Sequence, residues 1–163
     1  IFSMPNYEKT QQLPIYQKAE LLFQLVESLA ASLPEDNELL QSMKEIMRAD
    51  AMMLPAKIMG AEAGNIYSIR MQNAAIIRYH AMSLDTQVGG LRMYDTTIDK
   101  DFVKHIRTEI ENFRLLFIEW VNNFDTSNYL WDDWELFNPK GAIPPTDVDD
   151  FDFEDLFDEA DED

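Results

Sequence analysis

Hydrophobic side chains recur along this chain at steps of three and four residues, the spacing of amphipathic α-helices, in four separate stretches. The first covers residues 14–32, the second begins after residue 37, the third covers about 61–88, and the fourth ends near 124. The fourth is the most regular, with apolar residues at Phe102, Ile106, Ile110, Phe113, Phe117, Trp120 and Phe124. Four such helices bury their apolar faces only by packing together. We therefore predict an all-α, antiparallel up-and-down four-helix bundle.

Polar residues at the expected starts of two helices can cap their free backbone N–H groups. Asp36 or Asn37 would cap the second helix, and Thr97 or Asp99 would cap the fourth. The third helix should end at the glycine pair 89–90. These ends leave short links between helices, as an antiparallel bundle requires.

The rest of the sequence lies at the two ends of the chain. Residues 1–12 form an N-terminal extension to a bundle at 13–125, residues 126–146 form an irregular aromatic arm, and residues 147–163 form an acidic tail. The arm contains Trp131, Trp134 and Phe137, followed by a proline-rich run that cannot be helical throughout. Because aromatic side chains are costly to expose, we expect these three to dock on the bundle or on a neighbouring subunit.

Charge is distributed unevenly along the chain. Of the net charge of −18, residues 126–163 supply −13, from 14 acidic side chains against the single Lys140. The phosphates of nucleic acid would repel such a protein, so direct nucleic-acid binding is disfavoured. Like-charge repulsion also predicts that the tail does not fold alone.

The acidic tail is interleaved with four apolar side chains: Phe151, Phe153, Leu156 and Phe157. Such residues work against solubility, which favours a binding role over a purely solubilising one. We predict that a basic protein partner captures this segment as it folds. The alternatives are an inert tail, a decoy that mimics DNA, and an electrostatic guard over a basic patch of the protein itself.

Few residue combinations in this chain favour catalysis or metal binding. Cysteine is absent, and the residues three positions before His80 and His105 are Ile77 and Phe102, so the Glu-x-x-His motif of di-metal bundles is missing. The sequence shows no nucleophile elbow, phosphate-binding loop or paired carboxylates. We expect no enzymatic activity, no metal and no cofactor.

Two features of the helical stripes suggest structural roles. Asp50 lies on the apolar stripe of the second helix and Arg78 flanks that of the third, which predicts a partly buried ion pair that fixes helix register. A functional polar site inside the bundle is the alternative. Three apolar residues in succession at 52–54 cannot all face one core, which suggests a seam between subunits. The candidate seam residues are Met52, Met53 and Ile58.

The run MRADAMMLPAKIMGAEAG resembles the Arg-x-Ala…Ile-Pro…Ile-Ala-Glu-Gly signature of a small bacterial four-helix-bundle family. That family is known from products encoded by intervening sequences in large-subunit ribosomal RNA genes. The matching positions are Arg48, Pro55, Ile58 and Glu62, and LPIYQKA at 13–19 resembles the family's opening. The likeness covers residues 13–124 and implies an antiparallel bundle, often assembled as a pentameric ring, without enzymatic activity.

The chain is more distantly similar to the accessory proteins of diversity-generating retroelements, which are basic and bind a reverse transcriptase and nucleic acid. It departs from both groups in its closing helix, EIENFRLLFIEWVNNFD, where a leucine-rich helix is usual, and in its additional arm and tail. Its acidity argues against transferring nucleic-acid binding.

These observations favour a non-enzymatic, homo-oligomeric helical adaptor or scaffold that recruits a protein partner through its arm and tail. The absence of cysteine fits the cytoplasm, and no apolar run approaches the ~18 residues of a membrane span. The sequence begins without the basic and apolar regions of a secretory signal. The alternative function is a nucleic-acid-associated accessory factor resembling the retroelement proteins.

Overall fold

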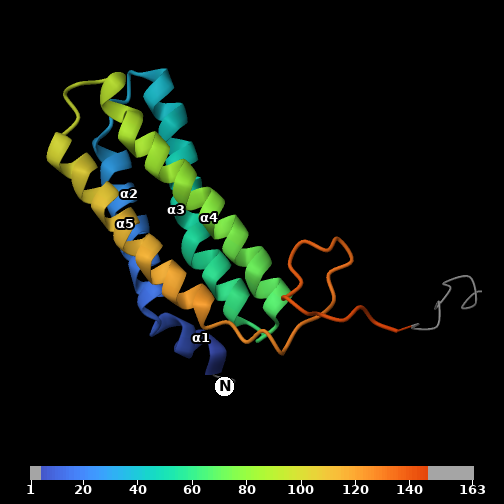
Figure 1. Ribbon diagram of the computed structural model, residues 1–163. Coiled ribbons are helices and arrows are strands. Elements are labelled where there is room, and N and C mark those ends of the chain that lie inside the picture. Colours follow the sequence, from blue (N-terminus) through green and yellow to red (C-terminus); the bar gives the residue numbers. More distant parts are fainter. Residues whose placement is uncertain (1–4, 147–163) are drawn as a thin grey trace, which may run out of the picture.

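The computed structural model describes residues 5–146, and residues 1–4 and 147–163 lie outside the described part. Its elements in chain order are α1 (Pro5–Gln11), α2 (Pro14–Ser32), α3 (Glu38–Glu62), α4 (Tyr67–Gly90), the short 3₁₀ helix η1 (Leu91–Met93) and α5 (Lys100–Asn122). Every regular element within residues 5–146 is a helix (Figure 1). The predicted all-α fold is confirmed.

The four long helices, α2 to α5, lie side by side, and consecutive helices run in opposite directions (Figure 1). The helix α3 packs against α2 and α4, and α5 closes the arrangement by packing against α4 and α2. The predicted helical bundle is therefore confirmed. Its closed order leaves each long helix one face that no other long helix covers.

The core consists of one apolar row on each long helix. The following side chains are fully buried: Leu22 and Leu29 of α2, Met47 and Leu54 of α3, Ile77 and Leu84 of α4, and Ile106 and Phe113 of α5. Each such side chain contributes about 1.5–3 kcal/mol when it is buried rather than exposed. The predicted stripe of α5 is buried except at Phe102 and Phe117, which are half-buried at its edge.

Side-chain caps fix the starts of two helices and decide between the predicted alternatives. The Asn37 side chain accepts a hydrogen bond from the Leu40 N–H at 3.1 Å, so Asn37 caps α3. The Asp99 carboxylate accepts from the N–H groups of Asp101 at 2.8 Å and Phe102 at 3.3 Å, so Asp99 caps α5.

Two element boundaries differ from the prediction. The predicted third helix begins near residue 61, whereas α3 continues to Glu62 and α4 begins at Tyr67. Residues 63–66 form the link between the two helices. The predicted N-terminal extension includes the helix α1, which packs across one end of the bundle against α2 and α3. Pro5 at its first position is the sequence signal for this helix.

The side chain of Ile58 is fully buried in the core, so its predicted place at a subunit seam is wrong. It follows Leu54 by one helical turn and precedes Ala61 by three residues, and all three face the same core row. Met52 is 56 % exposed and Met53 is half-buried. None of the helices within residues 5–146 is long and apolar enough to cross a membrane.

Candidate functional site

A polar cluster lies inside the bundle around Asp50, which is only 5 % exposed. His80 Nδ1 lies 2.7 Å from Asp50 Oδ1, and the Ser83 hydroxyl donates to Oδ2 at 2.6 Å. Gln87 Nε2 lies 3.4 Å from the same Oδ2 atom. The three partners occupy positions i, i+3 and i+7 of α4 and therefore share one face of that helix. The carboxylate is thus bound on both oxygens, which stabilises the contact between α3 and α4.

The predicted pairing of Asp50 with Arg78 is wrong. Arg78 is exposed and faces a groove between α4 and α5. Two residues correspond to about 200° of rotation around a helix, so Arg78 and His80 lie on nearly opposite sides of α4. Among the described residues, no group of three or more His, Cys, Asp or Glu side chains could hold a metal ion.

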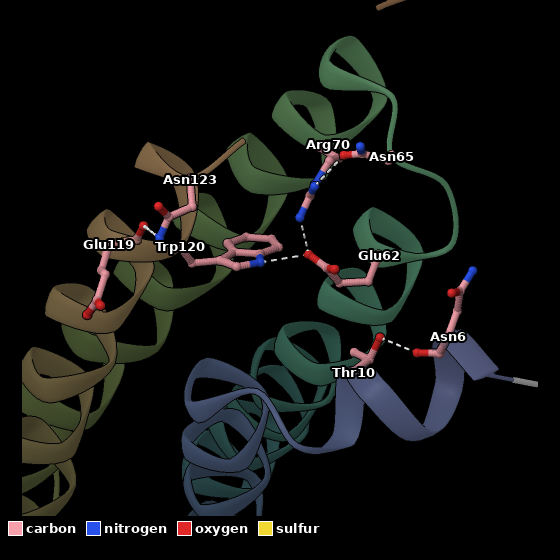
Figure 2. Close-up of polar contacts among 8 residues, drawn as sticks. All are labelled: Asn6, Thr10, Glu62, Asn65, Arg70, Glu119, Trp120 and Asn123. Atoms are coloured by element: carbon pink, nitrogen blue, oxygen red, sulfur yellow. Dashed lines mark hydrogen bonds and ion pairs between the residues drawn. The ribbon is translucent and has the colours of Figure 1, made fainter. Parts of the chain in front are cut away.

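A second polar cluster joins α3, α4 and α5 at the end of the bundle that carries the arm (Figure 2). Glu62 Oε1 accepts hydrogen bonds from Trp120 Nε1 at 2.8 Å and from the Arg70 guanidinium. Arg70 also donates to Asn65 Oδ1 at 2.8 Å, and its Cζ atom lies 4.3 Å from the centroid of the Phe124 ring. A guanidinium over an aromatic ring is an attractive contact. This cluster fixes the position of Phe124, from which the arm continues.

The arm folds back onto the start of α4. The Tyr67 N–H at the helix start donates to the Asn128 carbonyl at 2.7 Å, and the Ser68 hydroxyl donates to the Leu130 carbonyl. The Asn128 side chain donates in turn to the Asn65 carbonyl. The first N–H groups of a helix have no partner within the helix, so the arm satisfies part of this requirement. The helix α4 and the arm therefore stabilise each other.

Within the arm, Asp132 organises a loop rather than a turn of helix. Its carboxylate accepts from the backbone N–H groups of Phe137 at 2.9 Å, Trp134 at 3.0 Å and Leu136 at 3.0 Å. The hydrogen bond from Phe137 is the largest cause that lowers the pKa of Asp132 below its usual value. The Asn138 side chain accepts from the Asp132 N–H at 2.8 Å and donates to its carbonyl at 3.0 Å. These bonds hold the loop in one conformation.

The loop presents apolar side chains to solvent. Trp134 is 92 % exposed, and Leu136 and Ile143 are exposed as well. Trp131 and Phe137 are half-buried and border a hollow of about 440 Å³ between the arm and the first turns of α4. Trp131 and Phe137 therefore lie where docking on the bundle was predicted. Trp134 also borders this hollow, but its high exposure leaves its ring available to another molecule.

Sequence reasoning identified the aromatic residues of the arm but missed Asp132, which positions them. An aspartate whose side chain can accept hydrogen bonds from the backbone N–H groups of the next residues is a known turn signal. The run WDDWELFN contains such an aspartate. The predicted tail residues Phe151, Phe153, Leu156 and Phe157 lie outside the described residues.

No protein-family model, curated protein or solved structure matches this chain. The resemblance of residues 13–124 to the rRNA intervening-sequence family therefore stays a prediction.

Proposed function

We propose that this protein is a non-enzymatic helical adaptor that recruits a protein partner through its C-terminal arm, residues 126–146. The observation that carries the proposal is the 92 % exposure of Trp134 on a loop fixed by hydrogen bonds. Tryptophan is strongly enriched among the residues that dominate binding energy at protein interfaces. A loop already held in one conformation loses little entropy on binding, which increases affinity.

The tail extends this proposal. Its eleven acidic side chains give a basic partner a second, electrostatic contact next to the arm. Such charges mainly accelerate association, whereas the aromatic contact of the arm slows dissociation. The partner is thus a protein with an apolar pocket beside a basic surface.

Assembly into a homo-oligomer is also part of the proposal. Leu39 and Ile46 are each about half exposed on α3, and the half-buried Met53 follows Ile46, so the three residues recur at steps of seven. This spacing places them along one line of the helix, as at the seam of a coiled coil. An oligomer, a pentamer by the family resemblance, would present several arms and so increase avidity.

The alternative function, a nucleic-acid-associated accessory factor, would use the groove between α4 and α5, which Arg78, Arg107 and Arg114 line. The net charge of −18 opposes it.

The Trp134→Ala variant tests the role of the arm. Wild-type chain and variant are immobilised at equal density, and the proteins that they retain from cell extract are quantified by mass spectrometry. We expect Trp134→Ala to reduce retention of the partner by about thirtyfold, the effect of losing a dominant interface residue of about 2 kcal/mol. The bundle should fold normally, because Trp134 lies outside the core.

Met93→Ala is the matched control, since Met93 is an equally exposed apolar side chain, 86 % exposed, on η1. It should retain the partner like the wild type. If Trp134→Ala retains the same proteins in the same amounts, the arm is not the recruiting surface.

A further inference from the structure

A groove between α4 and α5 combines an apolar floor with a basic rim. It has a volume of about 520 Å³. Its apolar lining includes Ala81, Ile110, Phe113 and Phe117, and Met82 and Ile118 border it with about half of their surface exposed. Its basic side chains are Arg78, Arg107 and Arg114. An exposed apolar surface with charged edges is typical of a site that receives a chain segment.

A second hollow adjoins the groove at Arg107 and adds further positive charge. It is lined by Arg92, Lys100 and Lys104 as well. The two hollows thus contain six of the 13 lysines and arginines of the chain. This concentration is unusual in a protein whose net charge is −18. The face therefore favours an anionic ligand, in contrast to the rest of the molecule.

Within residues 5–146, only two acidic side chains line these hollows, and each neutralises one arginine. Asp85 pairs with Arg107 at 3.0 Å, and Glu111 pairs with Arg114 at 2.5 Å. Arg78 forms no ion pair within residues 5–146, and its guanidinium remains available at the rim. An excess of positive charge thus remains beside the apolar floor.

We propose that residues 147–163 of the same chain occupy this groove, with their carboxylates on the arginine rim and their phenylalanines on the apolar floor. The segment contains eleven acids interleaved with Phe151, Phe153, Leu156 and Phe157. Nucleic acid would satisfy the rim but not the floor. An acidic segment with phenylalanines satisfies both, and this complementarity selects it as the occupant.

The position of the arm allows this contact within one chain. The arm packs against Ser68 and Gln72, and Arg78 and Thr86 lie farther along the same helix. At 1.5 Å per residue, the groove extends from about 9 to about 21 Å beyond Gln72. A segment of the length of 147–163 spans at most about 61 Å when extended. Because the segment is tethered, its effective concentration at the groove is in the millimolar range, so even a weak contact is populated.

This contact would make the groove a resting place for the tail. A basic partner that binds the arm would compete with Arg78 and Arg114 for the same carboxylates. The tail could then not bind the partner and the groove at the same time. The inference does not depend on the proposed function, because the tail can occupy the groove whether or not Trp134 binds a partner.

The 163-residue chain allows a direct test, because it contains no cysteine. A spin label on Ala160→Cys leaves every acid and aromatic residue of the tail intact. The isoleucine methyl signals are then recorded by NMR. We expect Ile110 and Ile118 of the groove to be broadened at least severalfold more than Ile46, which lies on the outer face of α3. Salt near 1 M should abolish the difference, because it reduces the screening length to about 3 Å.

The double variant Arg78→Ala, Arg114→Ala should also abolish the broadening, whereas Arg48→Ala, at an ion pair between α2 and α3, should preserve it. Equal broadening at Ile46, or broadening that survives the double variant, would overturn the proposal. Spin-labelled chain mixed with isotope-labelled, spin-free chain tests for a second copy as the occupant, and broadening in that mixture would also refute it. If the methyl signals of Ile110 and Ile118 change only when an oligonucleotide is added, the groove binds nucleic acid instead.

Discussion

Among residues 5–146, Asp50 is the one buried Asp, Glu, Lys or Arg, and its partners determine what its loss costs. Asp50→Ala would leave the polar groups of His80, Ser83 and Gln87 without their acceptor inside the bundle. We expect it to lower the free energy of unfolding by about 2–4 kcal/mol, measured by urea denaturation. His80→Ala should cost about 1–3 kcal/mol, and Arg78→Ala less than about 0.5 kcal/mol. If Arg78→Ala is as destabilising as His80→Ala, the assigned partner is wrong.

The sequence indicated that Asp50 needs a partner but did not identify it. A charged side chain among the apolar positions of a helix needs a hydrogen-bond or ion-pair partner. The sequence of α3 alone is enough to show this need. Which residue of α4 faces Asp50 depends on the rotation of one helix against the other, which tertiary packing sets. The polar residues His80, Ser83 and Gln87 fall on one face of α4, and this spacing was the available signal.

At the scale of elements, the arm should depend on pH through Asp132. Its backbone hydrogen bonds lower the pKa of Asp132 in the folded arm below the ordinary aspartate value of about 3.9. A lowered pKa means that the ionised carboxylate stabilises the fold above that value, and that this stability is lost as pH falls through the lowered pKa. We expect the arm to stay ordered near pH 5 and to open in stronger acid. The amide NMR signals of Trp134 and Leu136 report this transition.

Two neighbouring variants identify the responsible group. Asp132→Asn removes the ionisation and should remove the acid transition from these amide signals. Asp133→Asn should leave the transition unchanged, because Asp132 alone accepts the three backbone bonds of the loop. An acid transition that persists in Asp132→Asn would assign it to another group.

The long helices were predictable because each carries its own periodicity, and Asn37 and Asp99 were among the predicted caps. The arm has no such repeat. Its conformation depends on contacts between residues far apart in sequence, such as Asn128 with Asn65 and Tyr67. The apolar residues of the arm were visible in sequence, but the exposure of Trp134 was not.

At the scale of the whole molecule, burial of Ile58 removes one predicted seam residue, and Leu39 and Ile46 form a line on α3 with Met53, which was already predicted there. Periodicity identifies an apolar face without saying whether the same chain or another copy covers it. The closed order of α2 to α5 makes this distinction, because it leaves the outer face of α3 without a long helix against it.

The native mass tests whether copies of the chain associate through this line. Light scattering of the wild type should give a multiple of the 19.0 kDa chain mass.

Ile46→Glu would place a charge in the middle of the seam, and burying an unpaired carboxylate costs more than the contact provides. We expect this variant to scatter as a single chain with its bundle intact, because Ile46 is already half exposed. Met93→Glu, a charge added to the more exposed Met93 on η1, should retain the wild-type mass. A wild-type mass of one chain, or an Ile46→Glu mass equal to the wild-type multiple, would contradict the seam on α3.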